Sequence, residues 1–129
     1  MEPEYLLDSN IVIAALNGSI PAPGLKAVAA MIDRTPLISV ISQIELLRFN
    51  DTPENEQVLS DFVENSIIYP LDPEVVERTI AICKQRRIKL PDAIIAATAL
   101  VEGLTLVTRN VDDFKNIPGL LLFDPWNSE

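Results

Sequence analysis

The sequence predicts an α/β protein, a three-layer α/β/α sandwich around a five-stranded parallel sheet. Short apolar segments alternate with longer segments of helical periodicity, which is the pattern of βαβ units. The 129 residues, 48% hydrophobic and 22% charged, fit one globular domain. No repeat, low-complexity tract or linker divides the chain, so a single domain over residues 1–129 is expected.

The first third of the chain contains two expected strands and two expected helices. Glu4–Leu7 is a short apolar segment that ends at an aspartate, and Leu37–Ile41 is apolar and β-branched, as strands usually are. Asn10–Asn17 and Leu25–Arg34 have helical spacing of their apolar residues, and a loop rich in proline and glycine separates them.

The middle third continues this alternation. Ser42 is expected to cap a helix that runs to about Phe49, with Glu45 three residues on as its capping-box partner. Pro53–Asn65 has the apolar stripe of a helix, and Ile67–Tyr69 is expected to be a short strand.

The last third places two strands beside an apolar helix. Pro73–Arg87 begins with proline and Pro91–Glu102 ends before a glycine, which are signals of helix starts and ends. Leu104–Thr108 and Leu120–Phe123 are expected strands, and Val111–Lys115 a single helical turn. With right-handed crossovers, strand ends and the following helix starts share one edge of the sheet, where sites form in such folds.

The composition limits the chemistry available to the chain. There is no histidine, so the commonest general base and transition-metal ligand is missing, and carboxylates become the main candidates. Cys83 is the single cysteine, which excludes an internal disulfide, fits a cytoplasmic protein, and is expected to be buried. The acidic first residues are unlike a signal peptide, and no apolar run reaches the ~18 residues of a membrane span. We therefore expect a cytoplasmic protein without membrane association.

Acidic side chains are expected at the carboxyl edge of the sheet. Asp8 follows the first strand directly, and Glu45 lies one turn into the helix after the second strand. Asp92 starts an almost wholly apolar helix, and Asp112 and Asp113 follow the fourth strand. The topology brings these five acids to the same edge.

Each acid also has an ordinary explanation. Asp8 and Asp92 suit a helix N-terminus, Glu45 fits the capping box or an ion pair with Arg48, and the acids after the fourth strand suit a cap or solvent. Their joint position is harder to explain, because carboxylates in one cleft repel unless a cation lies among them. Mg²⁺ or Mn²⁺ accepts such oxygen ligands and can activate water at a phosphate.

The sequence resembles the PIN-domain family, and within it the VapC-type ribonuclease toxins of bacterial toxin–antitoxin pairs. Five segments show this resemblance, in the family's order and over nearly the whole chain: Leu6–Ile13 (LLDSNIVI), Ser39–Leu47 (SVISQIELL), Leu90–Ala99 (LPDAIIAATA), Leu106–Phe114 (LVTRNVDDF) and Ile117–Leu120 (IPGL). The linked segments are specific, although each alone would be weak.

The resemblance implies a PIN-like α/β/α domain and an endoribonuclease that depends on one or two Mg²⁺ or Mn²⁺ ions. It implies that Asp8, Asp92 and Asp113 bind metal and that Glu45 supports it directly or through water. The supporting candidates near that site are Ser9, Thr108, Asn110 and Asp112. Asp112 is an extra acid, and Asn110 replaces an acid of some relatives, so the composition of a second metal site stays open.

Positive charge is scarce for a protein that binds RNA, since the net charge is −9. Four acids facing two divalent ions would leave about −5. Arg48 and Arg109 are the preferred candidates for RNA phosphates, because each lies near a candidate acid. A second basic group either contacts phosphates or, as the more ordinary interpretation, complements a helix C-terminus: Lys84, Arg86, Arg87 and Lys89. By resemblance we also expect an antitoxin partner and a homodimer.

The sequence argues against two other functional classes. A phosphoacceptor domain of the receiver type needs paired acids after its first strand and a lysine after its fifth. This chain instead has Asp8-Ser9-Asn10 after the first strand and Asp124-Pro125-Trp126 after the last. A non-catalytic PIN-like domain that only binds RNA or a partner is the remaining alternative, and the complete set of acids argues against it.

Overall fold

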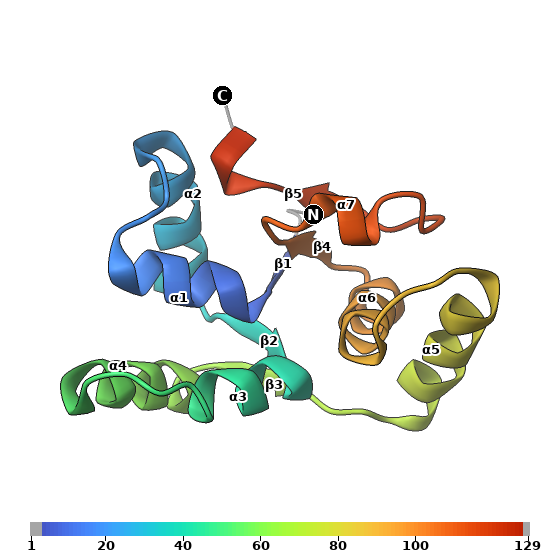
Figure 1. Ribbon diagram of the computed structural model, residues 1–129, viewed down its shortest axis with the longest axis horizontal. Helices are drawn as coiled ribbons and strands as arrows, with labels where there is room; N and C mark the ends of the chain where they lie inside the picture. The colour runs from blue at the N-terminus through green and yellow to red at the C-terminus, as the bar shows by residue number, and fades with distance from the viewer. Residues whose placement is uncertain (1–3, 128–129) are drawn as a thin grey trace.

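The computed structural model describes residues 4–127 and confirms the expected fold class. One five-stranded sheet has the strand order β3-β2-β1-β4-β5, and every pairing is parallel. The strands are β1 (Tyr5–Leu7), β2 (Leu37–Ser39), β3 (Ile67–Tyr69), β4 (Thr105–Val107) and β5 (Leu122–Phe123). Figure 1 shows helices on both sides of this sheet.

The helices occupy the segments between the strands. They are α1 (Ser9–Asn17), α2 (Ala22–Asp33), α3 (Val40–Leu47), α4 (Pro53–Glu64), α5 (Pro73–Gln85), α6 (Leu90–Glu102), α7 (Val111–Phe114) and the 3₁₀ turn η1 (Pro125–Asn127). Within residues 4–127, none of them alone has the length and apolar composition needed to cross a membrane. Only α1 and α2 taken together, with a bend of 115° between them, meet that test of length and composition.

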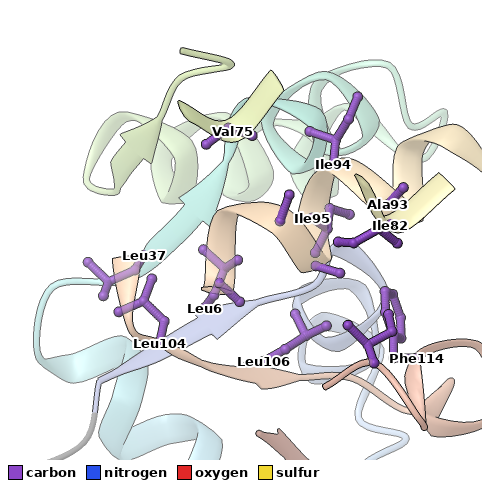
Figure 2. Packing of buried hydrophobic residues seen from close by; sticks show 14 residues of the cluster. Leu6, Leu37, Val75, Ile82, Ala93, Ile94, Ile95, Leu104, Leu106 and Phe114 are labelled. Atoms are coloured by element: carbon purple, nitrogen blue, oxygen red, sulfur yellow. The ribbon is translucent and has the colours of Figure 1, made fainter. Parts of the chain in front are cut away.

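Strand alternation divides the core into two layers. Leu6 and Leu106 pack with α5, α6 and α7, whereas their neighbours Leu7 and Val107 pack with α1, α2, α3 and α4. Side chains of successive strand residues point to opposite faces, so strands buried on both sides are apolar throughout. Figure 2 shows the first layer, in which Phe114 of α7 closes the end of the cluster.

Helix α6 lies at the centre of the first layer. Its residues 93–99 are all buried, as expected for a helix that is apolar nearly all round. The helix ends at Gly103, whose φ of 69° and hydrogen bond from its N–H to the carbonyl of Ala99 form a left-handed C-cap. Gly103 supplies this conformation without the steric cost of a side chain.

The sheet reverses its winding between β1 and β4. The chain builds β1, β2 and β3 outward on one side, then crosses to β4 beside β1 and continues to β5. β1 and β4 pair in register through Leu6 and Leu106. In open α/β sheets the crevice beyond the carboxyl ends of two such strands is where ligands bind. Asp8 and Thr108 are the first residues beyond these two ends.

Two helix starts differ from the expectation by three residues, whereas α1 and α6 each begin only one residue earlier than expected. α2 begins at Ala22 rather than Leu25, because a proline can occupy the first turn of a helix. α3 begins at Val40 and its N-cap is Ser39, not Ser42. The Ser39 Oγ accepts hydrogen bonds from the backbone N–H groups of Ile41 and Ser42, at 3.1 and 3.3 Å. Val40 and Ile41 on the helix side are as apolar as Leu37 and Ile38 on the strand side, so periodicity does not mark the boundary.

Cys83 is exposed, so its expected burial is wrong. α5 buries the stripe Val75, Thr79 and Ile82 instead. Cys83 follows Ile82 and therefore lies about 100° further round the helix. Ile80, on the same side, is 52% exposed.

Candidate functional site

Asp8 is the most deeply buried acid at the carboxyl edge, with 5% of its surface exposed. Its side chain caps α1 by accepting a hydrogen bond from the Ser9 N–H at 2.8 Å. Its other oxygen, Oδ2, accepts hydrogen bonds from the Thr108 hydroxyl at 2.9 Å and the Asn10 amide at 3.3 Å. The N-cap role uses only Oδ1. Oδ2 accepts hydrogen bonds from two side chains that a helix cap does not require.

The environment of Asp8 favours its neutral form. Burial, with a further contribution from the carboxylates of Glu45 and Asp92, raises the pKa of Asp8 from 3.8 to about 6, although the hydrogen bonds from Thr108 and Ser9 act to lower it. A buried carboxylate surrounded by other carboxylates is costly unless a cation compensates it. The raised pKa of this buried carboxyl makes Asp8 a candidate functional residue.

Glu45 reaches the site through Ser9. The Ser9 hydroxyl donates to Glu45 Oε1 at 2.8 Å, so α1 and α3 are joined above the ends of their strands. The capping box expected between Ser42 and Glu45 is absent, because Ser39 caps the helix. The Ser42 hydroxyl is buried and has no hydrogen-bond partner within residues 4–127. Ser9 thus contacts two candidate acids, Asp8 through its N–H and Glu45 through its hydroxyl.

Asp92 lies half-buried in the first turn of α6. Burial raises the pKa of its carboxyl, as do the negative charges of Asp113 and Glu45, while Lys89 acts in the opposite direction. Asp8 and Asp92 both feel Glu45, and Asp92 also feels Asp113. These interactions connect four expected acids, with Asp113 joined to the others through Asp92, and we call the four the acidic site: Asp8, Glu45, Asp92 and Asp113.

The two acids of α7 differ in their partners. Asp112 forms an ion pair with Lys115 at 3.1 Å, in which both side chains are largely exposed. Asp113 is also exposed, but its charge acts on Asp92. Asn110 is the N-cap residue of α7, makes no side-chain cap, and donates its N–H to Thr108 Oγ1 at 3.1 Å. Asp113 therefore interacts with another acid of the site, whereas Asp112 pairs with Lys115.

The donor set fits a hard divalent cation held partly by water. Within the described residues, no three acidic, histidine or cysteine side chains are close enough to coordinate one ion together. Mg²⁺ commonly takes one or two carboxylates and completes its shell with water. The buried Oδ1 of Asn10, beside Asp8, has no hydrogen-bond partner within residues 4–127 and is a ready acceptor for such a water. The residues thus fit an ion bound by few carboxylates.

Asn10 was not among the residues singled out in the sequence. Its only signal there was its place in Asp8-Ser9-Asn10, directly after the first strand. In the fold it lies in the first turn of α1 and donates to the buried carboxylate. The sequence does not reveal that an amide at this position turns back to the strand end.

The two arginines preferred for RNA phosphates contact parts of the chain other than the acids. Arg48 is the exposed C-cap residue of α3, and its N–H donates to the helix carbonyls of Ile44 and Leu46. The guanidinium of Arg109 stacks over the ring of Trp126, 4.4 Å from its centroid. This stacking engages Arg109 with η1, a contact that the sequence did not indicate.

A pocket of about 400 Å³ lies beside the acidic site. Its lining combines acids with the loop between α5 and α6: Arg87, Ile88, Lys89, Asp92, Asp112 and Asp113. We call it the loop pocket. Arg87 and Lys89 belong to the basic group noted in the sequence, and here they face the same space as three acids.

Comparison with known proteins identifies the family. Residues 5–120 match the family described as the PIN domain. The chain belongs to the PIN-domain family. This match includes every residue of the acidic site and confirms the resemblance seen in the sequence. Among curated proteins, none matches this PIN domain significantly.

Solved structures agree with this assignment. A chain of a toxin–antitoxin complex from Klebsiella pneumoniae is 30% identical, with a TM-score of 0.77 over 95% of this PIN domain and 98% of that chain. A chain of VapBC2 from Rickettsia felis, solved bound to a DNA fragment from its promoter, is 26% identical, with a TM-score of 0.74 over 93% and 97%. A chain of FitAcB from Neisseria gonorrhoeae is 26% identical, with a TM-score of 0.70 over 96% and 99%.

Proposed function

We propose that this PIN domain is a metal-dependent endoribonuclease and the toxin of a VapBC-like toxin–antitoxin pair. The observation that carries the proposal is the buried carboxylate of Asp8 at the junction of β1 and β4, within electrostatic range of Glu45 and Asp92. This placement is costly for a metal-free protein and favourable around Mg²⁺ or Mn²⁺. One or two ions are consistent with four acids.

The side chains of the site have different proposed roles. Asp8, Asp92 and Asp113 are the proposed ligands of one or two ions, and Glu45 assists directly or through water. Because no three of the described acids are close enough to coordinate one ion together, each ion would take at most two of these carboxylates directly and complete its shell with water. When bound, the ion supplies Lewis-acid stabilisation of a phosphate and lowers the pKa of water. Thr108 and Ser9 orient the carboxylates by donating hydrogen bonds to Asp8 and Glu45. Such outer hydrogen bonds fix the geometry of ligands and are part of a metal site.

Partners are proposed from the similar structures. The relative from Klebsiella pneumoniae is a toxin–antitoxin complex, so we expect a cognate antitoxin for this chain as well. Ile44 and Leu47 of α3 are 55% and 51% exposed and offer apolar surface for a partner, whereas Leu46 is buried in the core. We also expect a homodimer and a cytoplasmic location, both on the basis of resemblance.

The decisive experiment is cleavage of a mixed RNA pool by the purified chain. EDTA-treated protein should be inactive, and added Mg²⁺ or Mn²⁺ should restore cleavage to products with a 3′-hydroxyl and a 5′-phosphate. Asp8→Asn and Asp92→Asn should each reduce the rate at least about 100-fold, because each removes a charged ligand that few others can replace. Circular dichroism of both variants should match that of the parent.

Asp33→Asn is the matched control, since Asp33 is an exposed aspartate at the end of α2. It should cleave at the parental rate, whereas loss of cleavage in the site variants after the same purification excludes a contaminating ribonuclease. Full activity in both site variants would overturn the proposal. RNA binding by the parent without metal-dependent cleavage would instead favour a non-catalytic PIN domain.

A further inference from the structure

The loop pocket has walls of opposite charge. The loop between α5 and α6 contributes Arg87 and Lys89 to one wall, whereas Asp92 of α6 and Asp112 and Asp113 of α7 form the other. A pocket of about 400 Å³ is in the size range of small-ligand sites. The acids alone would repel a phosphate, so the two cations change what this space can accept.

Helix electrostatics do not explain the positions of these cations. α5 ends at Gln85, and Lys84 is the basic residue of its last turn, so Lys84 suits the helix dipole. Arg87 lies beyond that end. Lys89 is the N-cap residue of α6, where the dipole disfavours a positive charge and where its side chain makes no capping hydrogen bond. Both cations therefore lie where the pocket, not a helix terminus, uses their charge.

A hydrogen bond holds the two sides of the pocket in register. Arg86 Nη1 donates to the backbone carbonyl oxygen of Asn116 at 2.7 Å, joining the α5–α6 loop to the segment after α7. Asn116 has a φ of 72°, a left-handed conformation that asparagine tolerates better than most residues. This bond connects the neighbour of Arg87 to the segment just after Asp113, so the loop that contributes the cations is tied to the helix that contributes two of the acids.

We propose that Arg87 and Lys89 bind a backbone phosphate of the RNA strand and hold it against the acidic site. This inference rests on the proposed ribonuclease function and assigns phosphate binding to the α5–α6 loop rather than to Arg48 and Arg109. Arg109 already stacks on Trp126, and neither it nor Arg48 lines the loop pocket. Paired cations next to the acids offset the repulsion between the phosphate and a site rich in carboxylates.

The test measures binding separately from cleavage. A labelled single-stranded RNA is titrated with Asp8→Asn protein in Mg²⁺, at several KCl concentrations, and the dissociation constant is obtained by fluorescence anisotropy. Adding Arg87→Ala or Lys89→Ala should weaken binding at low salt. Each should also make the plot of log K against log salt shallower by about 0.7, the change for one lost phosphate contact on a single strand.

Arg78→Ala is the matched control, because Arg78 is an exposed arginine of α5, outside the loop pocket. It should keep the parental salt dependence. In the otherwise unchanged chain, Arg87→Ala and Lys89→Ala should raise KM for RNA more than they lower kcat.

Unchanged salt slopes and unchanged KM in both pocket variants would overturn this inference. The proposed function would still stand if cleavage by the parent required metal and the Asp8→Asn single variant did not cleave. If the parent shows no metal-dependent cleavage, the proposed function is overturned, and the inference with it.

Discussion

Asp8 shows how one residue can serve both a helix and a site. Its Oδ1 accepts the Ser9 N–H as an N-cap, while Oδ2 accepts hydrogen bonds from Thr108 and Asn10. The cap alone would be satisfied by an exposed aspartate. Burial instead raises the pKa of Asp8 to about 6, so the folded chain holds this proton more tightly than an unfolded chain does. The ionised form of Asp8 is therefore unfavourable in the metal-free fold, and a bound cation would stabilise it.

This raised pKa makes the stability of the metal-free protein dependent on pH. Between pH ~4 and ~6 the folded state binds more protons at Asp8 than the unfolded state, so stability falls as pH rises through this window. The shift corresponds to about 3 kcal/mol once Asp8 is ionised. Asp8→Asn should reduce the decline to the part that the raised pKa of Asp92 contributes, and in EDTA at pH 7 the variant should be more stable than the parent by roughly 1–3 kcal/mol.

Thermal unfolding in EDTA from pH 4 to pH 7.5 measures this effect, with Asp33→Asn as the exposed control. Mg²⁺ should then raise the Tm of the parent at pH 7 and leave that of Asp8→Asn nearly unchanged, because only the ionised carboxylate attracts the cation. A parent that is most stable at pH 7 without metal, or a less stable Asp8→Asn variant, would contradict the assignment.

At the residue scale, the sequence indicated the acids and not their contacts. Asp8 and Asp92 were found because one follows a strand and the other begins an apolar helix. The Ser9–Glu45 bond joins residues 36 positions apart, and the Arg109–Trp126 stack is likewise a product of tertiary packing. Local signals such as capping and periodicity do not contain such pairs.

At the scale of elements, α3 decides where Glu45 lies. Ser39 is fully buried and its Oγ accepts two backbone N–H groups of the first turn, so it fixes the start of the helix. From the sequence, Ser42, three residues further on, was expected to be the cap. The apolar run through Ile41 continues from strand to helix, so only the fold shows where the strand stops. Glu45 consequently reaches Ser9 instead of closing a capping box.

Ser39→Ala should therefore reduce stability and activity together. Loss of an N-cap costs about 0.5–2 kcal/mol, and fraying of the first turn of α3 would loosen the Ser9–Glu45 hydrogen bond. Chemical denaturation measures the first effect, and cleavage of RNA under metal saturation measures the second. We expect cleavage to fall several-fold while the fold is retained.

Thr52→Ala provides the control for this change. The Thr52 hydroxyl caps α4 by accepting the Asn55 N–H at 3.2 Å, and both residues lie away from the acidic site. A comparable loss of stability with unchanged cleavage is expected. Equal losses of cleavage in both variants would mean that general destabilisation, not the placement of Glu45, explains the effect of Ser39→Ala.

At the scale of the whole molecule, the alternation of strands and helices was enough to predict the layers. Continuous apolar strands require cover on both faces, and the observed core has a cluster on each. The strand order β3-β2-β1-β4-β5 was not predicted, because the periodicity of the chain does not say which strands pair. The 3₁₀ turn η1 was not predicted, because three residues with proline and tryptophan carry no periodic signal.

The contact between η1 and α2 joins the end of the described chain to its beginning. Gly24 of α2 is buried, and a Cβ atom there would overlap the carbonyl oxygen of Pro125 and lie 2.7 Å from its carbonyl carbon. The close approach places Trp126 against the second core layer and under Arg109. Two effects of Gly24→Ala therefore oppose each other, since alanine favours a helix by about 1 kcal/mol over glycine.

We expect the steric effect to win. Gly24→Ala should lower the free energy of unfolding by roughly 1–3 kcal/mol, because backbone rather than a flexible side chain must move. Trp126 is the single tryptophan, so its fluorescence should shift as η1 leaves α2. Ala29→Gly, at an exposed position of the same helix, should lose about 1 kcal/mol through helix propensity alone and keep the native fluorescence. A more stable Gly24→Ala protein would show that η1 does not pack tightly on α2, and that the Arg109–Trp126 stack does not anchor the segment after β4.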